Sequence, residues 1–189
     1  MVIFLATISL LTTQASAEPS LGACAWAELP VAEQQAVLTA YDRSISSGMR
    51  ALSQRDSVLQ TSVHSCAGRS DLPAILTQAS ISSHVIQLGA ANAVHREKGL
   101  GRVELDAAWS EAPNAARACA LNNAAKPFRI DGPVCPDRNA SRAFLEKLDL
   151  SSSNRNDRVA AEQALIYMNA KAQQEIADRL IATAPNTSR

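Results

Sequence analysis

The stretch SDLPAILTQASISSHVIQLGAANAVHREKG, residues 70–99, decides the fold of this chain. Its apolar residues recur at helical spacing and cover more than one stripe of the helix surface, which is typical of a helix surrounded by others. Pro73 suits the first turn of such a helix, and Gly99 is a stop signal. The sequence therefore predicts a long central helix from about Pro73 to Lys98.

Helical periodicity continues on both sides of this stretch. Upstream, apolar residues follow each other at spacings of three, four or seven from about Pro30 to Cys66. Gly48, preceded by two serines, favours a break or kink in this region, and one continuous helix is the alternative. Downstream, we expect helices at 103–112, 113–124, from about 138, and from 155 to about 184, with a proline-rich loop at 126–137.

Composition and charge limit the classes of protein that this chain can belong to. The chain has 189 residues, and its 18 Lys and Arg balance its 18 Asp and Glu. This neutrality gives no electrostatic reason to expect nucleic acid or an anionic membrane as the main partner. Alanine is abundant and β-branched residues are few, so we expect an all-α, single-domain helical bundle of about five to seven helices over residues 18–189.

The N-terminus carries the pattern of a secretory signal peptide. Residues 2–11 are apolar, and the small residues Ala15 and Ala17 predict cleavage after Ala17. We therefore expect a periplasmic or secreted protein without an integral membrane span. A lipid anchor at Cys24 is the less favoured alternative. Nine residues separate its short lipobox-like motif from the apolar run, and lipidation would leave three cysteines, an odd number that cannot all pair.

Four cysteines follow this signal, at Cys24, Cys66, Cys119 and Cys135. Exported cysteines are expected to pair, and four cysteines allow three connectivities. We favour Cys24–Cys66 with Cys119–Cys135, since the second bridge would close the proline-rich loop. The chain contains no Cys-x-x-Cys motif, so disulfide bonds are favoured over redox or metal chemistry.

The predicted central helix presents one polar face. His84 and His95 are eleven residues apart, which returns nearly to the same side of a helix, and Gln87 lies on that side as well. At 1.5 Å per residue the two rings are about 16 Å apart, too far to share a metal ion. The face is a candidate site, with an ordinary solvated surface as the favoured alternative.

Basic residues surround the proline-rich loop. Arg117, Arg129 and Arg138 could converge on a carboxylate or phosphate if the Cys119–Cys135 bridge forms. Asp131 and Asp137 lie among them and would neutralise part of their field. A solvated, salt-bridged loop is the favoured alternative.

No known catalytic signature is present, and we expect no cofactor. The favoured function is therefore a non-catalytic binding, interaction or accessory protein of the cell envelope. It would bind another envelope protein or itself through a helix face, for which the apolar side of the last helix is a candidate. The alternatives are a small exported enzyme that combines His84 and His95 with nearby carboxylates, or a metal or haem carrier.

Overall fold

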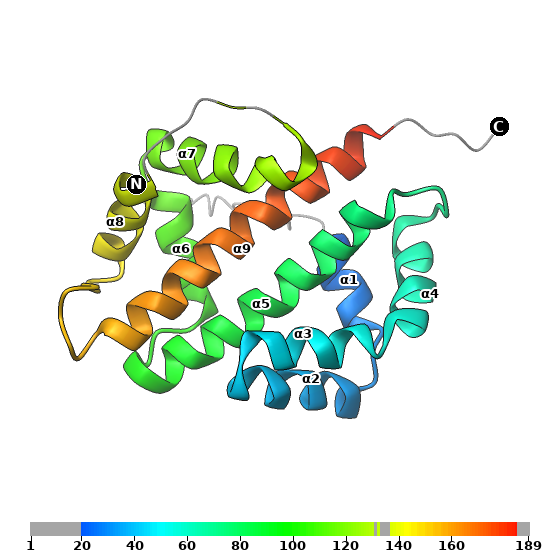
Figure 1. The fold of residues 1–189 in the computed structure, drawn as a ribbon, viewed down its shortest axis with the longest axis horizontal. Helices are drawn as coiled ribbons and strands as arrows, with labels where there is room; N and C mark the ends of the chain where they lie inside the picture. The colour runs from blue at the N-terminus through cyan, green and yellow to red at the C-terminus, as the bar shows by residue number, and fades with distance from the viewer. Residues whose placement is uncertain (1–19, 131, 133–136, 185–189) are drawn as a thin grey trace, which may run out of the picture.

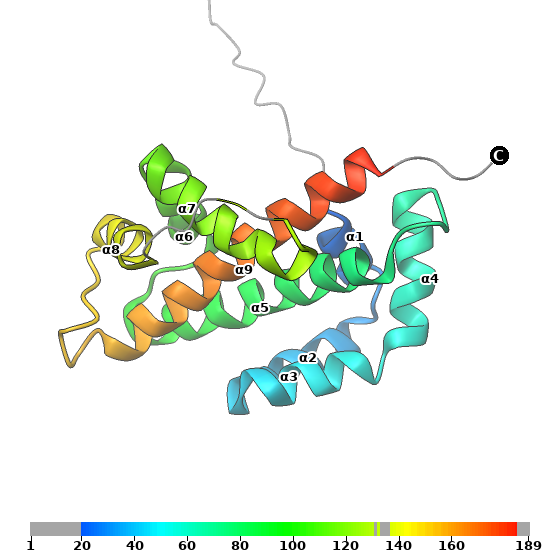
Figure 2. The ribbon, with the colours of Figure 1, turned by 45° about the horizontal axis from the view of Figure 1, so that its top comes forward.

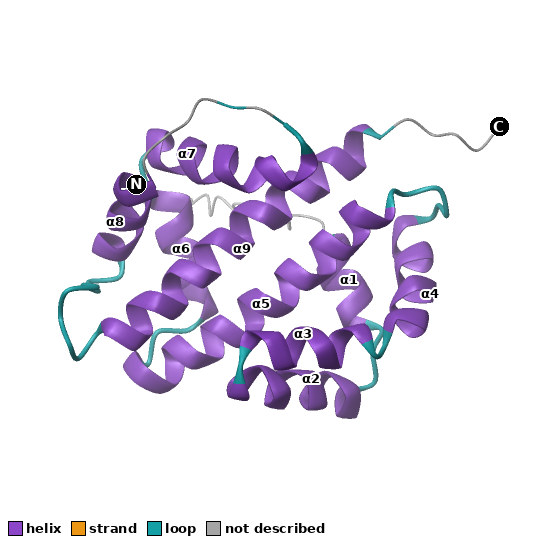
Figure 3. Ribbon diagram, in the orientation of Figure 1, coloured by secondary structure: helices purple, strands orange, loops and turns teal. Residues whose placement is uncertain are grey.

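The structure is a computed structural model, and it describes residues 20–130, 132 and 137–184. Over these residues it consists of helices and loops without a strand, which confirms the predicted all-α class (Figures 1 and 3). The expected signal peptide at 1–17 lies outside the described residues. The helices are α1 (Leu21–Ala27), α2 (Val31–Arg43), α3 (Ile45–Ser53), α4 (Asp56–Ala67), α5 (Ala74–Lys98), α6 (Arg102–Glu111), α7 (Asn114–Ala125), the 3₁₀ helix η1 (Lys126–Phe128), α8 (Asp137–Lys147) and α9 (Arg158–Thr183).

Helices α5 and α9 form the centre of the molecule and run antiparallel along each other (Figures 1 and 2). Ser80, near the start of α5, donates a hydrogen bond of 2.6 Å to Asp178, near the end of α9. At the opposite end of the pair, Lys98 forms a salt bridge with Asp157, the residue before α9. The bounds predicted for the central helix are confirmed, and α9 shares its central place.

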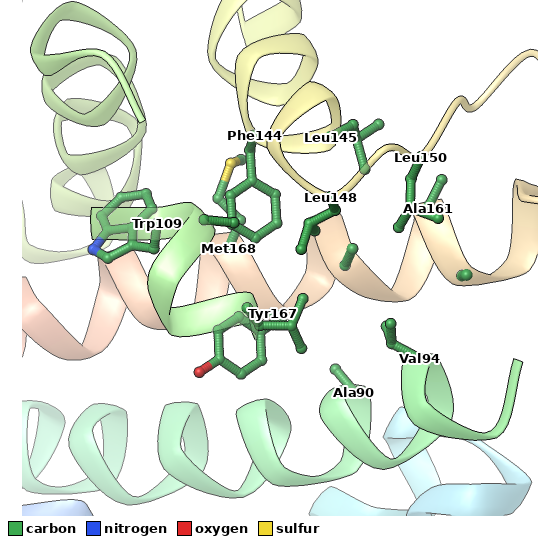
Figure 4. Packing of buried hydrophobic residues seen from close by; sticks show 14 of the residues in the cluster. Ala90, Val94, Trp109, Phe144, Leu145, Leu148, Leu150, Ala161, Tyr167 and Met168 are labelled. Carbon is green, nitrogen blue, oxygen red and sulfur yellow. The ribbon is translucent and has the colours of Figure 1, made fainter. Parts of the chain in front are cut away.

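The larger apolar cluster lies where α9 packs against the second half of α5 and against α6, α7 and α8 (Figure 4). Tyr167 and Phe144 are its largest fully buried side chains. Many members of the cluster are alanines, among them Ala90 of α5 and Ala161 of α9, and such small side chains let helices pack closely. The apolar side of α9 is thus covered by the chain itself, and it is not the free partner surface that the sequence analysis expects.

The second apolar cluster lies between the first half of α5 and helices α1 to α4. Helix α1 was not expected, since the predicted helices begin near Pro30. It forms because the Ser20 hydroxyl caps its N-terminus by accepting a hydrogen bond of 3.1 Å from the Ala23 amide. Trp26 of α1 and Val85 of α5 are both buried in this cluster.

The packing of Tyr41 of α2 explains why glycine occupies two positions in this half of the molecule. A Cβ atom on Gly48 of α3 would lie 2.9 Å from the Tyr41 Cα, and one on Gly89 of α5 would lie 2.3 Å from the Tyr41 Cδ1. Gly48 therefore lies inside α3, where it admits Tyr41. The break expected at Gly48 occurs instead at Ser44, whose extended backbone separates α2 from α3.

The described residues contain nine α-helices, more than the five to seven expected. With the expected break counted, the two additional helices come from α1 and from a further turn at Gln54 and Arg55, which separates α3 from α4. The predicted stop at Gly99 is confirmed, since this glycine adopts a φ of 71° and its amide closes the last turn of α5 on His95 at 2.8 Å.

One of the two expected disulfide bonds lies within the described residues. Cys24 of α1 is bonded to Cys66 of α4, as predicted, across a sequence separation of 42 residues. No cysteine in the described part of the chain is free. Cys135 lies outside that part, so the pairing of Cys119 with Cys135 stays a prediction.

Candidate functional site

A polar seam runs through the interface of α5 and α9. It comprises the buried side chains of Ser80, His84 and Gln87 on α5 and of Gln174 on α9. Gln87 donates a hydrogen bond of 2.6 Å to Gln174, and Gln174 donates one of 2.6 Å to the hydroxyl of Ser20. These two bonds connect α5 through α9 to the cap of α1.

Ser80 makes the second connection between the polar seam and α1. Its hydroxyl accepts a hydrogen bond of 2.9 Å from the Gly22 amide and donates the bond to Asp178. A Cβ atom on Gly22 would lie only 2.2 Å from the Ser80 carbonyl oxygen, so a larger residue would push α1 off α5. The close contact of α1 with α5 therefore requires glycine at this position.

His84 lies in the polar seam, and only 3 % of its surface is exposed. Its Nδ1 atom has no hydrogen-bond partner among the described residues. Burial, and then the nearby charges of Arg102 and Lys171, lower the pKa of His84 from 6.5 to about 4. The imidazole is therefore neutral near pH 7, and a substrate in solvent has no direct access to it.

The predicted polar face of α5 is thus divided by the structure. His84 and Gln87 are both buried in the polar seam, while His95 is exposed near the end of α5. The solvated surface that the sequence favours for this face is wrong for His84 and Gln87. Gln87 turns inward because α9 supplies Gln174 as its polar partner, which periodicity within a single helix does not reveal.

A second polar cluster joins α6 to α9 around Asp106. This carboxylate accepts hydrogen bonds of 2.8 Å from the Tyr167 hydroxyl and 2.6 Å from the Lys171 ammonium. Arg102 of the same helix lies 3.6 Å away as an ion pair. Burial and the adjacent carboxylate both raise the pKa of Tyr167, so the phenol stays protonated as the donor. The cluster holds Lys171 in place beside the polar seam.

An open cleft of about 600 Å³ lies between α3, α4 and the first half of α5. Its volume falls in the range of roughly 300–1,000 Å³ that is common for ligand sites. It exists because α4 packs mainly against α1, to which Cys66 ties it, so that the backbones of α4 and α5 stay apart (Figures 1 and 2). The apolar residues that line it include Met49, Leu52, Leu59, Val63, Ile81 and Ile86.

Polar side chains surround this apolar floor. Asp56, in the first turn of α4, is the only carboxylate among the described residues that line the cleft, and no lysine or arginine is among them. His64, at the other end of α4, also lies on the rim. The other polar lining residues are Ser53, Gln60, Thr77, Gln78, Ser82 and Gln173.

This cleft was not predicted from the sequence. Helical periodicity places Leu59 and Val63 on a buried stripe, and both are buried in the second apolar cluster. Periodicity does not reveal the distance between α4 and α5, which depends on α1 lying between them. In the structure, Ile75 of α5 is 57 % exposed at the edge of the cleft.

The candidate anion-binding arginines have different surroundings. The Arg117 guanidinium lies over the ring of Trp109, 5.5 Å from its centroid, which is a cation–π distance. Arg129 is exposed directly after η1, and the side chain of Arg138 lies outside the described residues. Arg117 thus has an aromatic partner, and the anion site stays a prediction.

In the described part of the chain, no group of three or more His, Cys, Asp or Glu residues is arranged to hold a metal ion. None of its helices combines the length and the hydropathy that a bilayer span requires. Comparisons with protein-family models, curated proteins and solved structures found no match to this chain, so the candidate site rests on its own geometry.

Proposed function

We propose that the protein is an exported, non-catalytic binding protein whose cleft between α3, α4 and α5 receives an apolar group of a partner. The observation that carries this proposal is the open cleft itself, whose lining is largely apolar and is bordered by polar side chains. Ile75 is exposed at its edge, while Leu59 and Val63 are buried beneath it. Apolar surface that enters it leaves water and contributes about 25 cal/mol per Å².

The charge pattern supports binding rather than general adhesion. The chain has no net charge, so a partner is not attracted by a strong overall field. Specificity then depends on the shape of the cleft and on the few polar groups at its rim, as in other apolar sites with sparse polar contacts.

Export is the second part of the proposal, and it is supported by the signal-like residues 2–17 and by the Cys24–Cys66 bond. Intact-mass analysis of the protein recovered from a native-like host tests it. We expect a chain that begins after Ala17, carries no lipid and contains four oxidised cysteines. A chain that retains residues 1–17 with free thiols would contradict export.

A fluorescence titration with a neutral naphthylamine dye tests the cleft. The dye emits strongly only in apolar surroundings, and we expect saturable binding at one site. The variant Ser82→Trp places a large ring in the cleft and should abolish this binding. Ser82 is suitable because its hydroxyl donates only to Ala79 of its own helix, at 3.3 Å, so no contact between helices is lost.

The matched control is Ser110→Trp on α6. Ser110 also bonds only to its own helix, donating to the Asp106 carbonyl at 2.8 Å, and it is exposed outside the cleft. Ser110→Trp should bind the dye as the parent protein does. Absence of saturable binding, or equal loss in both variants, would count against the cleft as the binding site.

A further inference from the structure

We infer that the cleft binds an amphipathic helical segment of another protein, with basic residues beside its apolar face. This inference rests on the proposed function, because it names the kind of partner that the same cleft receives. Three features of the cleft support it: the length of its floor, its open side and the charge of its rim.

The floor of the cleft has the dimensions of a short helix. Along α5 it follows Ile75, Ala79, Ser82 and Ile86, which are spaced by four, three and four residues and therefore share one face. Eleven residues of helix are about 16 Å long, which is about three turns. A partner helix with apolar residues at positions i, i+4, i+7 and i+11 presents a stripe of the same length.

The open side of the cleft favours a peptide over an acyl chain. A bound acyl chain would leave methylene groups in water along the open side, because it has no polar face. An amphipathic helix buries one face and leaves its polar face in solvent. Gln60 and Gln78, on opposite walls of the cleft, offer amide groups to polar side chains at the edges of such a helix.

The charge of the rim favours a basic partner over an acidic one. Asp56 is exposed and forms no ion pair with another described residue, and the described lining provides no cation for a carboxylate or phosphate. A lysine or arginine at the edge of a bound helix could pair with Asp56, whereas an acidic residue at the same position would be repelled.

A second copy of this chain does not present the required stripe. The described part of the chain exposes six large apolar side chains, and each is on a different helix or loop. None of its helices therefore offers two such residues one or two turns apart. The six residues are Val31, Val58, Ile75, Val103, Ile130 and Val159.

Fluorescence anisotropy with labelled peptides of about four helical turns tests the inference. The basic peptide carries leucines at i, i+4, i+7 and i+11 with lysines on both flanks, and a second peptide has glutamates in place of the lysines. We expect the basic peptide to bind more tightly and to gain helical circular dichroism on binding. Ser82→Trp should abolish this binding, and Ser110→Trp should leave it unchanged.

Asp56→Asn should weaken binding of the basic peptide about two- to fivefold, the range expected for one exposed ion pair. Asp42→Asn is the matched control, because it removes the same charge from α2, where Asp42 pairs with Arg96 outside the cleft. It should leave the affinity unchanged. An equal effect of both variants would indicate a response to net charge and would overturn the role of the rim.

The remaining outcomes separate this inference from the proposed function. Dye binding without peptide binding, or equal affinity for the two peptides, would overturn the basic helix and leave the cleft as a site for apolar groups. Loss of both dye and peptide binding would overturn both. Dimerisation that Ser82→Trp abolishes, measured by sedimentation, would identify a second copy as the occupant and overturn the inference.

Discussion

At the scale of single residues, Tyr41 shows how glycine positions carry tertiary information. Its ring lies between Gly48 and Gly89, which belong to helices on either side of it, and Tyr41 is only 4 % exposed. Burial raises the pKa of Tyr41 to about 12, so the phenol stays neutral in this site. The sequence favours a helix break at Gly48 and none at Gly89, whereas in the structure both glycines lie inside helices and make room for one ring.

Gly89→Ala tests this packing. Alanine would raise helix propensity by about 1 kcal/mol, but its Cβ would overlap the Tyr41 ring, and such overpacking typically costs about 1–3 kcal/mol. We expect the free energy of unfolding to fall by up to about 2 kcal/mol in urea denaturation. In the Tyr41→Ala background the ring is absent, and Gly89→Ala should be neutral or stabilising. A gain of stability in the parent background would contradict the proposed contact.

The candidate site residues were predictable in part. The stripe containing His84 and Gln87 follows from helix geometry, and both residues share the polar seam. The burial of Gln87 was not predictable, because it depends on Gln174, which is 87 residues away from Gln87 in sequence. The rim residue Asp56 could not be recognised either, since the space in front of it is set by α1 rather than by its own helix.

At the scale of elements, helix ends with a local cause were predicted better than those with a tertiary cause. The end of α4 at Gly68 and the end of α5 at Gly99 follow from left-handed glycines, with φ values of 60° and 71°. The break between α2 and α3 was predicted at Gly48 but lies at Ser44, because a glycine and a capping serine both occur in this short stretch. The Ser44 hydroxyl, which accepts a hydrogen bond of 3.0 Å from the Ser47 amide, fixes the actual start of α3.

Ser44→Ala should therefore destabilise the protein more than Ser46→Ala. The first variant removes the N-cap of α3, which typically costs about 1 kcal/mol, while Ser46 is an exposed residue of the same helix without a capping role. Thermal unfolding should show a lower midpoint for Ser44→Ala. Equal midpoints for the two variants would mean that packing of α3 on Tyr41, and not the cap, determines where α3 begins.

The Cys24–Cys66 bond ties α4 to α1 and thereby helps to fix the position of α4. In the chain-entropy model, a closed loop of this length stabilises the folded state by about 4 kcal/mol. We expect the double variant Cys24→Ala/Cys66→Ala to lose a stability of that order in guanidinium unfolding. It should also bind the naphthylamine dye less tightly, because α4 forms one wall of the cleft and α1 is its main support.

A double variant that keeps full stability would show that α1 and α4 are held by the second apolar cluster alone. Cys24→Ala/Cys66→Ala with reduced stability but unchanged dye affinity would separate the two roles. In that case the bond would stabilise the fold without shaping the cleft.

At the scale of the whole molecule, α5 connects two halves of different construction. Its first half packs against α1 to α4 in the second apolar cluster, and its second half packs with α9 in the larger one. The polar seam lies at this junction. The central place of this helix was predicted, because its apolar residues lie on several sides. The division of the core into two clusters was not predicted, because it depends on which helices pack against each half of α5.

Acid should weaken the whole fold through His84. The pKa of His84 is about 4 in the folded protein and has its ordinary value of 6.5 in the unfolded chain. Between pH 4 and 6.5 the imidazole is therefore protonated in the unfolded chain and neutral in the folded protein. Stability is then fully present above pH 6.5 and decreases as pH falls towards about 4, by about 3 kcal/mol in total. Asp178 opposes this near the lower end, since burial raises its pKa and the folded protein takes up that proton more readily.

Guanidinium unfolding of the parent protein and of His84→Gln over this pH range measures the effect. The glutamine variant has no imidazole to protonate beside Arg102 and Lys171, so its stability should vary less with pH. His95→Gln, on the exposed part of the same helix, should keep the slope of the parent protein. If His84→Gln and the parent lose stability in parallel, the acid response arises elsewhere, and the polar seam does not couple protonation of His84 to the stability of the fold.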